Sequence, residues 1–185
     1  MKICMLSLSA SDDSVGRVGS QALRRMLAAV GHEVDWIDIR SLPPVWVDNK
    51  GVSALPEEYS EVDASLRAAD GVILAVPVYC YTASSPAKAI TELFCKSLAR
   101  MPVGILVSAG SLRSHLAVGD LMLSMMFEQG TVCYPKTVMV TKGDLSLGKP
   151  DPALEARLQA FASDFLAFAQ AVQAYRQLAL ASEAA

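Results

Sequence analysis

The sequence predicts one α/β domain in which helices cover both faces of a parallel sheet. Short, continuous apolar runs such as Val72–Val76 and Val103–Val107 lack the alternation of half-buried strands, so they are typical of strands buried on both faces. Segments with helical spacing separate these runs, as expected for a parallel sheet. The 185 residues, 52% of them hydrophobic, are enough for one substantial core.

The first half of the chain alternates strands with helices. Gly31 is a suitable residue to end the first helix. The connection Ser41–Glu58 is the longest, and long connections in compact domains are usually functional or mobile. In chain order, we expect strand Lys2–Leu8, helix Val18–Val30, strand Glu33–Ile39, helix Tyr59–Ala69 and strand Val72–Val76.

The second half continues the same alternation. Pro86 suits the first turn of a helix, where its missing N–H has no partner to lose. In chain order, we expect helix Pro86–Ala99, strand Val103–Val107, a helix ending near Gln129, strand Thr131–Thr141 and a final helix from Asp151. The domain is expected to span residues 1–175, and the Ala-rich tail 176–185 is expected to fray.

Five strands and five helices match the flavodoxin-like three-layer sandwich, whose five-stranded parallel sheet has the order 2-1-3-4-5. Ligands of this architecture bind beyond the carboxyl ends of the strands. Three strand-exit loops there, Ser9–Gly16, Pro77–Ser85 and Ser108–Ser114, are rich in Ser, Thr and Gly. Because nothing comparable occurs on the opposite edge, we place the candidate site at these loops.

The first exit loop leads into a helix whose N-terminus has unpaired N–H groups and a partial positive charge. Hydroxyls and one cation there could hold a phosphate. Asp12 and Asp13 oppose this by adding negative charge, and Ser and Asp could equally be helix caps. Neither a dinucleotide fingerprint nor a P-loop is present. The candidate phosphate ligands are Ser9, Ser11, Ser14, Ser20 and Arg17.

The second and third exit loops could hold a planar ring. Tyr79 and Tyr81 could contact its faces, although aromatic loop residues could also pack on the core. Gly110 would let the backbone approach a ligand closely. Arg113 and His115 could contact the ring edge or an anionic second substrate, although His115 could simply face water.

Composition excludes several function classes. The net charge is −3 without a basic run, so binding to nucleic acid or an anionic membrane has no electrostatic support. No apolar run is long enough to span a membrane. The four cysteines lack zinc or dithiol spacing, and Cys4 and Cys133 fit as buried thiols, which suits the reducing cytoplasm. No catalytic triad or paired carboxylates are convincing, which favours cofactor chemistry.

Two stretches resemble the NADPH-dependent FMN reductase family within the flavodoxin-like superfamily. PVYCYTASSPAKAITELF resembles its ring-binding loop and helix, and VSAGSLRSHLAVGDLMLSMMFEQGTVCYPKTVMV is similar to its second signature. Within that family, the sequence most resembles the FMN reductases of two-component alkanesulfonate monooxygenase systems. The resemblance implies FMN as cofactor or substrate, NADPH or NADH as hydride donor, a possible partner monooxygenase, and a homodimer or homotetramer.

The resemblance also implies site residues, none of them catalytic or metal-binding. The first loop departs from the family by reading Ser9-Ala10-Ser11-Asp12, so Arg17 and Ser20 match only loosely. Carried over by position, Pro77, Val78 and Tyr79 would line the flavin ring, and its other edge would be flanked by Ser108, Ala109, Gly110 and Ser111. Cys80 departs from the family, which often has Asn or Lys after the tyrosine. The same loops add Cys80, Tyr81 and Arg113 to the expected flavin-binding residues.

Alternative functions remain open at this stage. One is a non-enzymatic regulatory or interaction protein of the same fold, which the acidic first loop favours. The other is an NAD(P)H:quinone-type reductase with tightly bound flavin. Leu121–Phe127 nearly encircles its helix with apolar side chains, which indicates a subunit interface.

Overall fold

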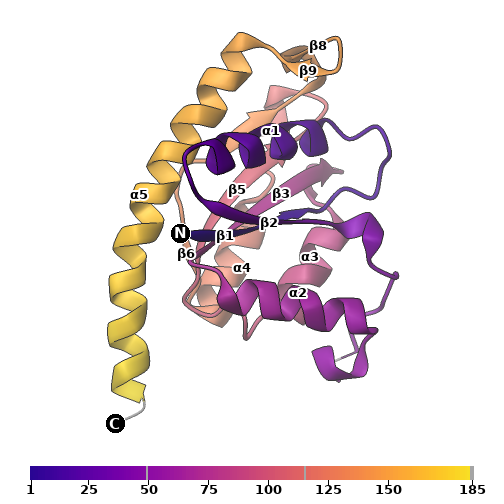
Figure 1. Cartoon of the computed structure of the whole chain (residues 1–185). Coiled ribbons are helices and arrows are strands. Elements are labelled where there is room, and N and C mark those ends of the chain that lie inside the picture. The colour runs from indigo at the N-terminus through magenta and orange to yellow at the C-terminus, as the bar shows by residue number, and fades with distance from the viewer. Residues whose placement is uncertain (49, 115, 184–185) are drawn as a thin grey trace.

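The computed structural model describes residues 1–48, 50–114 and 116–183 and confirms the predicted fold. Its sheet has the order β2-β1-β3-β5-β6, and β7 also pairs with β5 (Figure 1). These strands are parallel to one another. They are β1 (Lys2–Ser7), β2 (Glu33–Asp38), β3 (Gly71–Tyr79), β5 (Pro102–Ser108), β6 (Val132–Cys133) and β7 (Val138–Val140).

Helices form a layer on each face of the sheet (Figure 1). One layer packs α1 and α5 against the sheet, and the other contains α2, α3 and α4. The helices are α1 (Val15–Ala29), α2 (Glu57–Ala68), α3 (Ser85–Leu93), α4 (Gly119–Gln129) and α5 (Pro152–Glu183).

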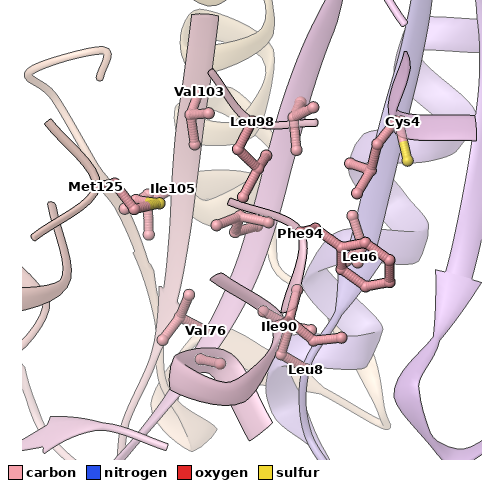
Figure 2. Close-up of a cluster of buried hydrophobic side chains, with 14 of the residues drawn as sticks. Cys4, Leu6, Leu8, Val76, Ile90, Phe94, Leu98, Val103, Ile105 and Met125 are labelled. Atoms are coloured by element: carbon pink, nitrogen blue, oxygen red, sulfur yellow. The ribbon is translucent and has the colours of Figure 1, made fainter. Parts of the chain in front are cut away.

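The core on the α2–α4 side consists of aliphatic side chains around Phe94, whose ring stacks with that of Tyr59. Figure 2 shows Cys4, Leu6 and Leu8 of one strand and its exit together with side chains from α3 and α4. Burial raises the pKa of the Cys4 thiol to about 12, so Cys4 acts as a small apolar residue, as predicted.

The core on the α1 and α5 side contains an aromatic cluster. The rings of Phe161 and Phe165 in α5 lie 6.0 Å apart and nearly parallel. Tyr134 contacts both rings by its edge, with centroids 5.9 and 6.3 Å away. Gly104 of β5 lies directly beneath the two phenylalanines, where a larger residue would collide with them.

The second exit loop differs from the prediction, because β3 continues past Pro77 to Tyr79 and turns back as β4 (Thr82–Ala83). Val78 pairs with Ala83 and Tyr79 with Thr82 in an antiparallel hairpin. Cys80 and Tyr81 form its tip with φ of 50° and 61°, which is the backbone that a tight hairpin turn requires. This segment is therefore a hairpin rather than an irregular loop.

Two other predicted elements are shorter than expected. The strand Thr131–Thr141 is divided into β6 and β7, because Pro135 between them has no N–H to donate to a ladder. The helix predicted to reach Ala99 ends at Leu93, and Phe94 leaves helical geometry at φ −102° and ψ 25°. Tight turns follow, which allow Phe94 and Leu98 to enter the core together.

The C-terminal helix α5 is continuous to Glu183, so it extends past the end predicted near Tyr175. The domain boundary at residue 175 stays a prediction. Among the described residues, no helix is both long and apolar enough to cross a membrane. The remaining short elements are η1 (Ile39–Ser41), η2 (Val52–Ala54), η3 (Leu112–Ser114), η4 (Lys142–Asp144), β8 (Leu145–Ser146) and β9 (Lys149–Pro150).

Candidate functional site

The three predicted exit loops meet at one cavity of about 190 Å³ beyond the carboxyl ends of the strands. Because parallel strands end at the same edge of a sheet, loops far apart in sequence come together there. The cavity is lined by Ser9, Ser11, Asp13, Ser14, Val15, Pro77, Val78, Tyr79, Ser108, Ala109, Gly110 and Lys142.

Hydrogen bonds between neighbouring strand ends fix the loops relative to one another. The N–H of Leu8 donates to the carbonyl of Ala75 at 3.0 Å, and the N–H of Ala109 donates to the carbonyl of Val140 at 3.1 Å. The buried Ser84 hydroxyl donates to the carbonyl of Leu8 at 3.4 Å and also caps α3. The cavity walls are therefore positioned by buried backbone contacts.

Helix α1 begins at the cavity. Ser14 is its N-cap, and its hydroxyl accepts a hydrogen bond from the N–H of Arg17 at 3.2 Å. Gly16 lies against Ser108 of β5, so closely that a Cβ on Gly16 would be 2.4 Å from the Ser108 Oγ. The absence of a side chain at this position allows the helix N-terminus to approach the third exit loop.

Arg17 points into the first exit loop and not into the cavity. Its guanidinium donates to the carbonyls of Ser9, Ser11 and Asp12 and to the Asp38 carboxylate, at 2.9 to 3.1 Å. The side chain is 9% exposed. Arg17 therefore shapes the loop from within, whereas the sequence predicts that it binds a phosphate.

Asp12 also points away from the cavity, because Arg40 pairs with it at 2.9 Å. Arg40 pairs in addition with Asp38 at 2.7 Å. Burial alone would raise the pKa of the Asp38 carboxyl, but the hydrogen bonds and charges of Arg40 and Arg17 outweigh it, so the pKa lies below its usual value. One carboxylate at the end of β2 thus anchors Arg17 of α1 and Arg40 of η1, the two arginines that contact the first exit loop.

Replacing Asp38 with Asn should lower the free energy of unfolding by about 2 kcal/mol, the typical value of hydrogen bonds to a charged group. The depressed pKa makes this contribution complete above about pH 4, the unfolded value, and lost as pH falls through the folded value. Urea unfolding of wild type and Asp38→Asn between pH 3 and 7 measures it. The difference in free energy of unfolding between the two proteins should be constant near neutrality and become smaller in acid.

A matched control is Asp48→Asn, because Asp48 pairs with Lys50 on the surface. Exposed ion pairs contribute little, so this variant should unfold at the same urea concentration as wild type. Equal losses in the two variants would contradict an anchoring role for Asp38.

The second exit segment divides its predicted residues between the cavity and the solvent. Pro77, Val78 and Tyr79 line the cavity, and the Tyr79 side chain stays half-exposed there. Cys80 and Tyr81, at the hairpin tip, are exposed and lie outside the lining, because the turn directs the tip away.

The third exit loop places Ser108, Ala109 and Gly110 in the cavity wall. Ser111 is exposed and lies outside the lining. Arg113 belongs to η3, but its side chain and the whole of His115 lie outside the described part of the chain.

Ser20 is buried on the inner side of α1 and is not among the residues that line the cavity. Its hydroxyl donates to the carbonyl of Arg17 and accepts from the indole N–H of Trp36. Ser20 therefore joins α1 to β2, and a direct contact with a ligand stays a prediction.

Val15 and Lys142 line the cavity but were missed by reasoning from the sequence. Lys142 lies in η4, directly after β7. Its local sequence, an exposed Lys in a Gly-containing turn, has no distinguishing signal. Its position after the last parallel strand is the signal that could have identified it, because that position places it at the same sheet edge as the other loops.

A second cavity, of about 480 Å³, lies between the outer strand β2 and α2. Its charged lining residues, Asp38, Glu58 and Glu61, are all acidic. This cavity is unsuited to an anionic ligand, and the exit-loop cavity is therefore the candidate site.

Comparisons with known proteins agree with the fold. The family model of the NADPH-dependent FMN reductases matches residues 1–144. No curated protein has significant sequence similarity to the chain.

Solved structures share the architecture at low identity. An NADH:FMN oxidoreductase, EMOB in its apo form, is similar with a TM-score of 0.72 and 20% identity over 89% of this chain and 87% of that chain. FerB, an NAD(P)H:(acceptor) oxidoreductase from Paracoccus denitrificans, has a TM-score of 0.76 and 16% identity over 91% and 97%. Flavodoxin 1 from Bacillus cereus has a TM-score of 0.62 and 16% identity over 90% and 97%.

Proposed function

Because this chain belongs to the NADPH-dependent FMN reductase family, we propose that it reduces FMN held across its three exit loops, with NADPH or NADH as the hydride donor. The observation that carries the proposal is the convergence of all three loops on one cavity with the half-exposed Tyr79 in its wall.

The residues of the cavity fit a flavin mononucleotide. Gly110 has open space where a Cβ would lie, so a flat ring can approach the backbone of the third loop. Pro77, Val78 and Tyr79 offer an apolar and aromatic surface on the other side. Ser14 and the start of α1 offer hydroxyl and N–H donors, which suit a phosphate.

The residues of this chain would promote the reaction mainly by positioning the two reactants, and less by acid–base chemistry. Bound FMN supplies a hydride acceptor. Tyr79 and Gly110 would orient the ring, and the half-exposed face of Tyr79 leaves room for a nicotinamide. Holding donor and acceptor in contact is the main source of rate in such a reaction, because it removes the entropy cost of their encounter.

The test is NAD(P)H consumption by purified protein, followed at 340 nm on adding FMN, with heat-unfolded protein as the control. We expect flavin-dependent oxidation of NADPH or NADH. A protein that consumes neither with FMN, FAD or riboflavin would contradict the proposal and favour the non-enzymatic alternative.

We further propose that reduced FMN leaves the protein for a partner monooxygenase. The exposed cavity and the absence of an arginine directed into it from the first loop support weak binding. Flavin should therefore be lost on gel filtration. Retention of one flavin per chain, with rapid turnover of quinones, would instead identify a quinone-type reductase.

The exposed apolar side of α4 supports assembly as a homodimer or homotetramer. Leu123, Met126 and Phe127 are 67%, 48% and 92% exposed, which is unusual for adjacent large apolar residues. Light scattering should give a multiple of the 19.7 kDa chain mass, and a monomer would contradict assembly. The four free cysteines support a reducing cytoplasmic location.

A further inference from the structure

The cavity contains two charged lining residues among those described, Asp13 and Lys142. Arg17 of α1 already makes four hydrogen bonds, to the first exit loop and to Asp38. Arg40 is likewise paired, with Asp12 and Asp38. Among the side chains that the structure describes, Lys142 is therefore the cation available to a ligand in this cavity.

The backbone that presents Lys142 is held firmly. Thr141 and Asp144 form a capping box around η4, in which the Asp144 carboxylate accepts from the N–H and the hydroxyl of Thr141, each at 2.7 Å. Arg157 of α5 pairs with the same carboxylate. The turn is thus anchored to the α5 layer, while no described carboxylate pairs with the Lys142 ammonium.

Lys142 and the N-terminus of α1 lie at the same end of the sheet. A Cβ on Gly19 of α1 would be 2.8 Å from Val140 Cγ2, so the helix rests directly on the end of β7, two positions before Lys142. Val15 and Lys142 both line the cavity. A group bound at the start of α1 is therefore within the same recess as the lysine side chain.

We propose that Lys142 recognises the ligand phosphate and makes this site prefer FMN to the uncharged riboflavin. The inference rests on the proposed function. A phosphate monoester carries close to two negative charges at neutral pH, and a charge-assisted contact with an ammonium favours it over a neutral hydroxyl. Asp13, on the same lining, acts in the opposite sense, so the preference is set by the balance of these two residues.

The test measures dissociation constants for FMN and riboflavin separately, by quenching of flavin fluorescence with no nicotinamide present. Lys142→Met should raise the dissociation constant for FMN about 3- to 10-fold, as expected for loss of one charged contact. The dissociation constant for riboflavin should stay within about 2-fold of wild type. Lys142→Arg should retain most of the preference. Asp13→Asn should lower the dissociation constant for FMN about 2- to 5-fold and leave that for riboflavin unchanged.

Lys149→Met is the matched control, because it removes the same charge from an exposed lysine of β9 that lies outside the lining. The Lys149→Met variant should bind FMN and riboflavin with the same dissociation constants as wild type. The FMN preference of wild type should also decrease as salt is raised from 50 to 500 mM, since screening weakens the contact.

The outcomes separate the two proposals. If Lys142→Met weakens FMN and riboflavin equally, or weakens neither, the phosphate assignment fails while the flavin site stands. The phosphate assignment would also be overturned if Lys149→Met lost as much of the preference for FMN as Lys142→Met does. The overall charge of the protein, and not a contact with Lys142, would then be the cause. If wild type binds and reduces neither flavin, the proposed function fails and the assignment with it.

Discussion

Gly104→Ala, which adds one methyl group, should be among the most destabilising small substitutions in this protein. The added Cβ would lie 2.9 Å from Phe161 Cζ and 2.9 Å from Phe165 Cδ2. Neither side can yield easily, because the two rings stack on each other and β5 is hydrogen-bonded to strands on both sides. We expect a loss of about 2 to 3 kcal/mol, typical of an overpacked core.

Thermal unfolding by circular dichroism measures this loss, which should lower Tm by about 5 to 10 °C for a chain of this length. The chain provides a graded control series. Gly71→Ala, with Phe165 Cζ at 3.2 Å, should have a smaller effect. Gly119→Ala in α4, where no heavy atom lies within 4 Å, should be neutral or slightly stabilising. Equal Tm values for Gly104→Ala and Gly119→Ala would contradict the close packing of α5 on β5.

Predictions from the sequence succeeded where one local property decides the structure. The continuous apolar run of Val103–Val107 can be buried on both faces only in a central parallel strand, and it is. The same reasoning placed Ser9, Tyr79 and Gly110 at one sheet edge, since each follows the carboxyl end of a strand. All three line the cavity.

The sequence does not reveal the position of a side chain where distant residues decide it. Arg17 is drawn away from the cavity by Asp38, which reaches it because β1 and β2 pair with Ser7 opposite Asp38. The residues near Arg17 in the sequence do not indicate that Asp38 is its partner. The hairpin tip shows another limit, because the positive φ of Cys80 and Tyr81 is imposed by strand pairing on residues that do not favour it.

Gly16→Ala should have the largest effect on flavin binding that a small substitution outside the cavity lining can produce. Its Cβ would lie 2.4 Å from Ser108 Oγ and 2.9 Å from Ser108 Cβ. Rotation of the hydroxyl relieves the first contact but not the second, so α1 and β5 must separate. Ser14 and Val15 would then move relative to Ser108 and Ala109 across the cavity.

We expect the dissociation constant for FMN to rise at least 10-fold, because small displacements of a binding group are costly. Fluorescence titration measures it, and the helix propensity of Ala excludes loss of α1 itself as the cause, since Ala favours helix over Gly. Gly110→Ala serves as a stability control, because no heavy atom lies within 4 Å of its added Cβ and its Tm should match wild type.

A compensating change makes the steric cause testable. Ser108→Gly removes both the Oγ and the Cβ that the new methyl group meets, so the double variant should bind FMN as well as Ser108→Gly alone. In a double-mutant cycle the two changes would then be strongly non-additive, as contacting residues are. If Gly16→Ala instead weakens binding equally in both backgrounds, helix displacement is not its cause, and the contact between α1 and β5 does not set the width of the site.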